Sequence, residues 1–129
     1  MKNLFKKLLK PESLGTTFTP TDAVMRFQLM YQNLLIGELL LQNGKWRFKY
    51  SDAFKAQSIL KPLVEFPDIH KLYISEELSP FFLERIPGLG QPKVQEILSK
   101  ENIDEQNTAA LLKRFGRVSI TNPFKLEAS

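Results

Sequence analysis

The sequence contains no cysteine, a single histidine and no apolar stretch long enough for a membrane-spanning helix. Without cysteine, disulfides, thiolate metal sites and thiol nucleophiles are excluded. A helix that crosses a bilayer needs about 20 consecutive apolar residues, so we expect no membrane span. These absences suit the reducing cytoplasm, which is the location we expect for this protein.

Residues that could carry catalysis are also scarce. The one histidine, His70, has Asp68 two positions before it but no further partner for general-base chemistry. The sequence has no paired histidines at a metal-binding spacing, no nucleophile elbow and no glycine-rich phosphate loop between a strand and a helix. We therefore predict that the protein is not an enzyme and that it uses neither a metal nor a cofactor.

Positive charge is concentrated in the first half of the 129 residues. The net charge is +4, yet residues 61–129 carry nine Lys/Arg against ten Asp/Glu. Residues 1–10 alternate leucine and phenylalanine with four lysines at helical spacing. This segment suits either contact with a membrane surface or a partner, or a frayed or docked terminal turn. We expect residues 1–22 to form a flexible N-terminal extension.

Alternating apolar and polar residues predict an antiparallel meander. Strands are expected over residues 23–32, 34–42 and 45–50. Gly37, inside the second strand, predicts a bulge or a close backbone approach. Asn43-Gly44 suits a two-residue type I′ turn, because both residues readily adopt positive φ. The third strand separates aromatic from basic side chains: Trp46, Phe48 and Tyr50 on one face, Lys45, Arg47 and Lys49 on the other.

The second half of the chain changes from strand to helix patterns. Segment 51–57 is expected to be a loop or helical turn, followed by a short edge strand over 58–66 and another strand over 70–75. Helices are predicted over residues 75–86 (capped by Ser75), 91–103 and 104–116, and a last strand starts at 117 and stops at Asn122-Pro123. Together these elements predict an α+β fold in one domain, residues 23–126. It consists of a curled antiparallel sheet of about five strands with a small C-terminal helical cluster.

The segment RIPGLGQPKVQEIL, residues 85–98, fits two different structures. One is a helix-hairpin-helix that binds nucleic acid. Gly88 and Gly90 would let backbone N–H groups face a phosphate, and Lys93 would add a positive charge. The other is a helix end, a glycine turn and a new helix that starts at Pro92.

Three features of this segment favour the plain turn. Gln91 separates the second glycine from the proline, and Val94 stands where two helices of a hairpin need a small residue. The surroundings are also slightly acidic, whereas a phosphate-binding module is expected in a basic field. A nucleic-acid-binding protein therefore stays the alternative function, and we regard direct nucleic-acid binding as the less favoured one.

Three segments in a fixed order carry a family resemblance. LLIGELLLQNGKWRFKYSDAF combines a strand with an internal glycine, a turn and a W-x-F-x-Y strand. LSPFFLERIP contains a PFF…L-P pattern, and LLKRFGRVSITNPFKL contains a glycine turn before a final strand. Together they resemble the N-terminal subdomain of HipA-family kinases, over residues 24–126. The last segment is similar to the stand-alone form of that subdomain.

The resemblance implies a function in which this chain has no catalytic part. In HipA-family proteins the subdomain is fused to a serine/threonine kinase core, but this sequence lacks kinase signatures such as HRD-like or DFG-like triplets. The resemblance therefore implies a HipS-like antitoxin subunit of a HipBST-type toxin–antitoxin system. Such a subunit binds and restrains a HipA/HipT-like kinase, and a HipB-like DNA-binding protein is a further candidate partner. Steric block, allosteric restraint and completion of the kinase fold are all open as mechanisms.

Interfaces are typically centred on a few aromatic and arginine side chains. The candidates here are Trp46, Phe81, Phe82, Arg85 and Pro87. Adjacent Phe81 and Phe82 cannot both lie in a narrow apolar stripe of a helix. Either one packs in the core and the other contacts a partner, or both belong to a wide apolar face. Trp46 either contacts the partner or belongs to the core with Phe48.

Overall fold

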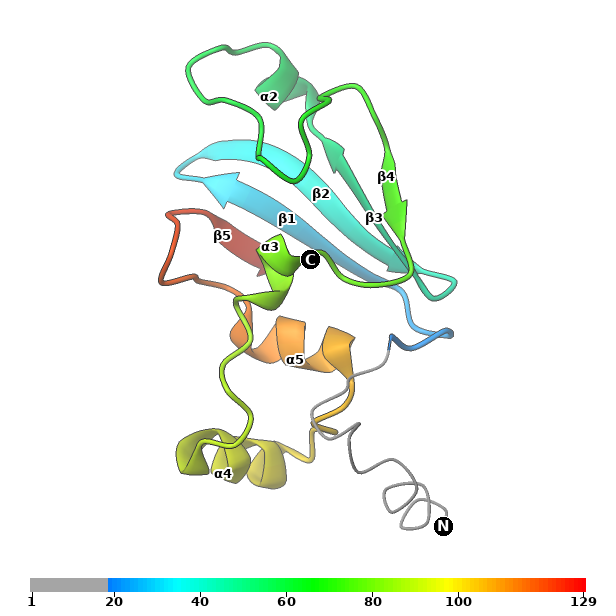
Figure 1. Ribbon diagram of the computed structural model, residues 1–129, viewed down its shortest axis with the longest axis vertical. Helices are drawn as coiled ribbons and strands as arrows, with labels where there is room; N and C mark the ends of the chain where they lie inside the picture. The colour runs from blue at the N-terminus through cyan, green and yellow to red at the C-terminus, as the bar shows by residue number, and fades with distance from the viewer. Residues whose placement is uncertain (1–18) are drawn as a thin grey trace.

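The structure, a computed structural model, describes residues 19–129 of the chain (Figure 1). The elements follow in the order β1 (Met25–Tyr31), β2 (Leu34–Gln42), β3 (Lys45–Tyr50), α2 (Asp52–Lys55), β4 (Tyr73–Ser75), α3 (Pro80–Leu83), α4 (Pro92–Glu101), α5 (Thr108–Phe115) and β5 (Lys125–Ala128). The strands form one antiparallel sheet in the order β4-β3-β2-β1-β5, which leaves β4 and β5 at its edges. The predicted α+β class and five-stranded sheet are confirmed.

The three-stranded meander is formed where the sequence predicts it. Asn43 and Gly44 both have positive φ, 55° and 74°, so the expected type I′ turn joins β2 to β3. Both expectations for Gly37 hold. The register of β1 and β2 shifts next to this residue. A Cβ built on Gly37 would lie 2.5 Å from the carbonyl oxygen of Lys49, so only glycine fits there.

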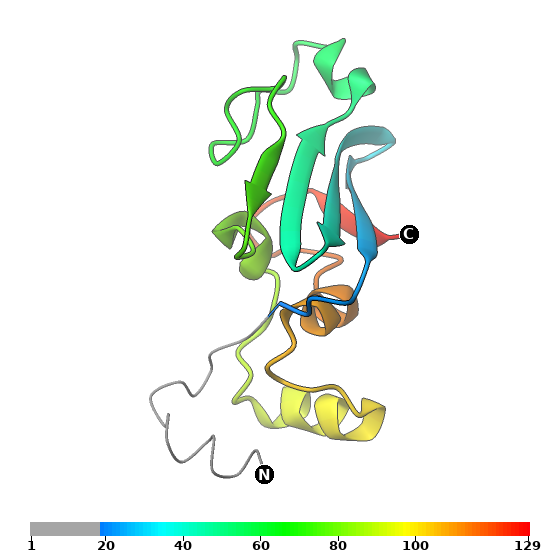
Figure 2. The ribbon, with the colours of Figure 1, turned by 90° about the vertical axis from the view of Figure 1, so that its right-hand side faces the viewer.

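One face of the sheet is covered, and the protein's main core lies on that face. Figures 1 and 2 show α3 and the loop between α2 and β4 on the same side of the sheet, with α5 below α3. The buried side chains of this core are Phe27, Leu29, Ile36, Leu39, Leu41, Trp46, Phe48, Tyr50, Phe54, Leu63, Phe66, Leu78, Phe81, Phe82, Ala109, Leu112 and Leu126. Alternate residues of β1, β2 and β3 supply most of the strand contributions, as the period-2 pattern predicts.

The helix predicted over residues 75–86 is much shorter in the structure. It starts at Pro80 and ends at Leu83, and its N-cap is Ser79 rather than Ser75. Ser75 instead ends β4, and its hydroxyl accepts a hydrogen bond from the backbone N–H of Glu77. Proline is tolerated in the first turn of a helix but disrupts its interior, so a helix that contains Pro80 has to begin there.

The edge strand predicted over residues 58–66 is wrong, because this segment is a loop without strand pairing. Side chains satisfy its backbone instead of a sheet ladder. Gln57 bonds both the N–H and the carbonyl of Leu60 through its side-chain amide. The hydroxyl of Tyr50 donates to the carbonyl of Phe66 and accepts from the N–H of Leu63. The expected strand over 70–75 is only three residues long, Tyr73–Ser75.

The last strand lies after Pro123 instead of before it. β5 pairs with β1 along Lys125–Ala128 and buries Leu126 against the core. Residues 117–121 form a turn, in which the hydroxyl of Ser119 accepts from the N–H of Thr121. Such local side-chain bonds compete with strand pairing, which explains why the alternating pattern there does not become a strand.

The two longer helices lie within the predicted ranges, although α5 starts at Thr108, four residues later than predicted. They form a second, smaller apolar cluster. Val94 and Leu98 of α4 pack against Leu111 of α5. α4 ends at Asn102 in the left-handed conformation, and Asn107 caps α5 by accepting from the N–H of Ala110. Figures 1 and 2 show α4 on the far side of α5 from the sheet.

Candidate functional site

The residue with the most specific surroundings among the interface candidates is Arg85, which follows α3. Its side chain is 5% exposed, and burial lowers the pKa of the guanidinium below its usual value. Nη1 donates to the carbonyl of Gly116 at 3.1 Å. Nη2 donates to Oδ1 of Asn122 and to the carbonyl of Phe124, each at 3.1 Å. Arg85 thereby fastens the segment between α5 and β5 to the end of α3.

A neighbouring carboxylate completes this attachment. Glu84 accepts from the Thr121 hydroxyl at 2.8 Å and from the side-chain amide of Asn122 at 3.1 Å. Consecutive residues Glu84 and Arg85 therefore hold the same loop from two directions. The structure gives Arg85 a clear positioning role inside the chain, and its role in binding a partner stays a prediction.

Phe81 and Phe82 both point into the protein. Phe82 has no exposed surface and Phe81 is 9% exposed. Their rings meet edge to face with centroids 5.0 Å apart, and Phe82 also faces Phe48 across the core. Of the two expectations for this pair, the structure shows the wide apolar face that buries both rings. Contact of either ring with a partner stays a prediction, and in this conformation the folded chain already covers both.

Trp46 lies on the covered face of β3 with Phe48, and it is 3% exposed. Its indole N–H donates to the hydroxyl of Thr19 at 3.1 Å. Trp46 is therefore a core residue of the folded chain, and its predicted partner contact is untested. Pro87, the last of the candidates, is half-buried after α3.

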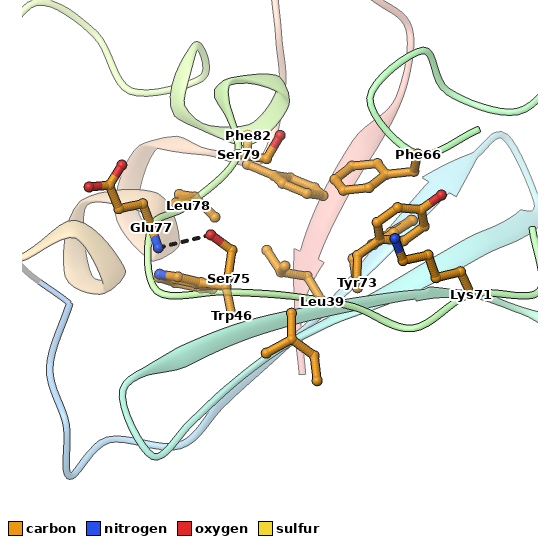
Figure 3. Close-up of a pocket in the computed structure, with 12 residues that line it drawn as sticks. Leu39, Trp46, Phe66, Lys71, Tyr73, Ser75, Glu77, Leu78, Ser79 and Phe82 are labelled. Carbon is orange, nitrogen blue, oxygen red and sulfur yellow. Dashed lines mark hydrogen bonds between the residues drawn. The ribbon is translucent and has the colours of Figure 1, made fainter. Parts of the chain in front are cut away.

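A pocket of about 180 Å³ lies between the β3–β4 edge and the start of α3 (Figure 3). Its walls include Trp46, Phe66, Tyr73 and Phe82. Figure 3 shows Lys71 and Glu77 at opposite ends of this pocket rather than beside each other. Because apolar rings make up much of the walls and these two charged groups stand apart, the pocket suits one apolar side chain.

The glycine turn does not have the form that the nucleic-acid alternative requires. A helix-hairpin-helix needs a helix on each side of the turn, but α3 has four residues and ends five residues before Gly88. The helix after the turn, α4, packs on α5 instead, through Val94 and Leu98. Gly88, Gly90 and Lys93 are all exposed. The structure therefore supports a turn that redirects the chain into α4.

His70 lies exposed in the loop before β4. The carboxylate of Asp68 accepts a hydrogen bond from the backbone N–H of His70 at 2.9 Å, which is a local turn contact. Within residues 19–129, no three His, Cys, Asp or Glu side chains come together as a metal site. Over the same residues, none of the helices has both the length and the apolar character needed to cross a bilayer.

Two features of this region could not be read from local patterns. The partners of Arg85 lie 31 to 39 residues further along the chain. The pocket likewise joins β3 to residues after β4. The only signal for Arg85 in the sequence is a charged residue two positions after the apolar run PFFL, which is equally typical of a solvated position.

The family described as HipA N-terminal domain matches residues 27–120 of the chain. A search of the curated proteins found no match. The matched residues run from β1 through α5 to the loop that Glu84 and Arg85 hold, so the family resemblance and the described fold cover the same part of the chain.

Proposed function

Because the chain belongs to the HipA N-terminal domain family, we propose that it is a non-catalytic antitoxin subunit that binds and restrains a HipA-type serine/threonine kinase. The observation that carries this proposal is the match over residues 27–120, which includes all of the described helices and all of the sheet except β5 and the first two residues of β1. Membership of this family supports a role in a HipA-related toxin–antitoxin system.

The contacts of the buried polar groups agree with a binding role. Arg85 and the hydroxyl of Tyr50 both bond to backbone groups of their own chain. They stabilise loops and do not converge on a cavity where a substrate could react. We therefore expect the described part of the chain to act through its surface, by binding another protein.

The proposed restraint takes the form of docking on the kinase in place of the fused subdomain. In proteins that carry both parts on one chain, this subdomain is tethered to the kinase core. A separate chain with the same fold can occupy the equivalent place and hold the kinase in one arrangement. Phe82 and Arg85 would contribute to this interface indirectly, since they fix α3 and the loop 117–124 that reaches the surface.

Co-purification tests the proposal. The chain is co-expressed with a HipA-type kinase from the same genome that lacks this subdomain, and the mixture is analysed by size-exclusion chromatography at micromolar concentration. We expect a stable complex and reduced kinase autophosphorylation. A HipA-type kinase that already carries its own N-terminal domain is the matched control and is expected not to bind. Absence of a complex with the short kinase would refute the proposal.

A further inference from the structure

In the described part of the chain, no helix lies over the middle of the sheet surface opposite the core (Figures 1 and 2). α2 borders one end of this surface, where Asp52 and Lys55 line a hollow with Glu38 and Lys49. The buried apolar side chains of α2 and α3, and Ala109 and Leu112 of α5, belong to the core cluster on the covered face. We call the opposite surface the open face. The strand register defines its two central rows. The first row is Ile74, Arg47, Leu40 and Arg26. The second row is Lys49, Glu38, Gln28 and Glu127.

The charges of the open face are unequal. Lys45 lies two residues before Arg47 on β3, and Lys125 lies two residues before Glu127 on β5. Because side chains alternate between the faces along a strand, both lysines project on the same side as these rows. The face therefore carries five positive side chains against two carboxylates. Both carboxylates already have a cation, since Glu38 pairs with Arg26 at 3.6 Å and Glu127 pairs with Arg117 at 3.2 Å.

Arg47 is the unusual member of this surface. It is half-buried, with Leu40 directly beside it on β2 and Ile74 directly beside it on β4. Its Nε is buried and has no hydrogen-bond partner among residues 19–129. No carboxylate in that range lies within ion-pair distance of its guanidinium either. A half-buried arginine whose guanidinium has no acceptor gains a charge-assisted hydrogen bond when a carboxylate arrives.

The apolar neighbours of Arg47 are themselves accessible. Ile74 is 50% exposed at the edge strand, and Leu40 is half-buried in the middle of the sheet. An arginine bordered by accessible apolar side chains is the usual composition of an interface centre. A nucleic acid would instead favour a continuous row of cations, but Glu38 and Glu127 interrupt the row next to Arg47.

We propose that the open face is the docking surface for an acidic patch of the kinase, with Arg47 as the central anchor. This inference rests on the proposed function, because the partner is the same kinase. Charge complementarity carries the choice of an acidic partner. A carboxylate of the kinase would accept hydrogen bonds from the two Nη groups of Arg47, and an apolar kinase side chain would cover Ile74 and Leu40. Lys45 and Lys49 would steer the approach.

Affinity measurements on matched charge reversals test the inference. The kinase without its own N-terminal domain is titrated by isothermal calorimetry with the wild-type chain, Arg47→Glu, Lys45→Glu and Lys113→Glu. Lys113 is exposed on α5 and serves as the control. We expect Arg47→Glu to weaken binding about thirtyfold or more, Lys45→Glu about fivefold, and Lys113→Glu less than about twofold. Added salt should weaken binding of the wild type.

The outcomes separate the two proposals. Lack of binding by the wild-type chain would refute the proposed function itself. Wild-type binding that is unchanged by Arg47→Glu and Lys45→Glu would overturn only the docking surface. Weaker kinase binding by Lys113→Glu alone would overturn the docking surface as well, because it would show that the kinase binds the helical side. Thermal unfolding of each variant verifies the fold, and Lys45→Glu keeps the test decisive should Arg47→Glu not fold, because Lys45 is exposed.

Discussion

The two faces of the sheet differ although the same strands form both. On β3, Trp46, Phe48 and Tyr50 are almost fully buried. Arg47 and Lys49 lie between them in sequence and project to the opposite side. The covered face is aromatic and makes the contacts that hold the fold together. The open face is charged and leaves one arginine without an acceptor in the described part of the chain.

Because successive residues of one strand face opposite sides of the sheet, one set of side chains can stabilise the fold while the other is free to bind a partner. Removal of a covered-face side chain leaves a cavity in the core, so it should reduce stability strongly. Replacement of an exposed charged side chain on the open face alters only solvent-exposed charge, so it should leave stability almost unchanged. The following four changes test that separation, in order of expected effect on the free energy of unfolding.

The largest loss is expected for Phe82→Ala. Phe82 is fully buried and its ring contacts those of Phe48, Phe66 and Phe81. Loss of such a ring costs about 3–5 kcal/mol of unfolding free energy, measured by chemical denaturation. The neighbouring Leu83, 38% exposed, provides the control: Leu83→Ala should cost about 1 kcal/mol or less. Equal effects of the two substitutions would contradict the account of α3.

The second change is Arg85→Ala. It removes four hydrogen bonds to the segment between α5 and β5, including those to the carbonyls of Gly116 and Phe124. Buried acceptors left without a donor cost about 2–3 kcal/mol in sum. Arg85→Lys is the informative companion, because a single ammonium keeps the charge but not the planar fork. Full stability of Arg85→Lys would mean that charge, rather than geometry, holds the loop.

Tyr50→Phe should have an intermediate effect that depends on pH. At neutral pH the lost hydroxyl leaves the carbonyl of Phe66 and the N–H of Leu63 unpaired, a cost of about 1–2 kcal/mol. Burial raises the pKa of Tyr50 from 10.0 to about 12, since it disfavours the phenolate. The hydroxyl's contribution is therefore present in full below pH 10 and is lost as the pH rises toward 12.

Denaturation of the wild type and Tyr50→Phe at several pH values measures this dependence. The stability difference between the two proteins should shrink between pH 10 and pH 12, because only the wild type has this phenol to ionise on unfolding. The lysines titrate in the same range in both proteins, so they cancel in the difference. A difference that stays constant over this interval would show that Tyr50 ionises as easily in the folded chain as in the unfolded chain.

The smallest effect is expected on the open face. Arg26 and Glu38 form an ion pair of 3.6 Å, and their side chains are 55% and 32% exposed. Exposed pairs contribute about 0–0.5 kcal/mol, so Arg26→Ala should barely change the unfolding midpoint. A double-mutant cycle with Glu38→Ala isolates the pair. A coupling above about 1 kcal/mol would break the distinction between the two faces.

Local sequence signals predict a large part of the fold. Period-2 alternation and the Asn43-Gly44 turn are local signals, and β1, β2 and β3 follow them. α4 and α5 also follow from local periodicity and capping residues. Local signals suffice there because neighbouring residues already determine the turn and the buried face.

Elements whose position depends on contacts between residues far apart in the chain are predicted less well from the sequence. Residues 117–121 alternate like a strand, but the edge of β1 pairs with Lys125–Ala128 instead. That choice depends on Arg85 and Glu84, which hold the intervening loop from more than 30 residues away. The burial of both Phe81 and Phe82 likewise results from tertiary packing around a single-turn helix.

We propose that the kinase binds the open face and not the helical side of the chain. Lysine acetylation with mass-spectrometric readout compares them directly, because Lys45, Lys49 and Lys125 of the open face and Lys93, Lys100 and Lys113 of the helices are all exposed. In the kinase complex, the account predicts that Lys45, Lys49 and Lys125 lose reactivity while Lys93, Lys100 and Lys113 keep it. Protection of the helical lysines with unchanged open-face lysines would contradict it.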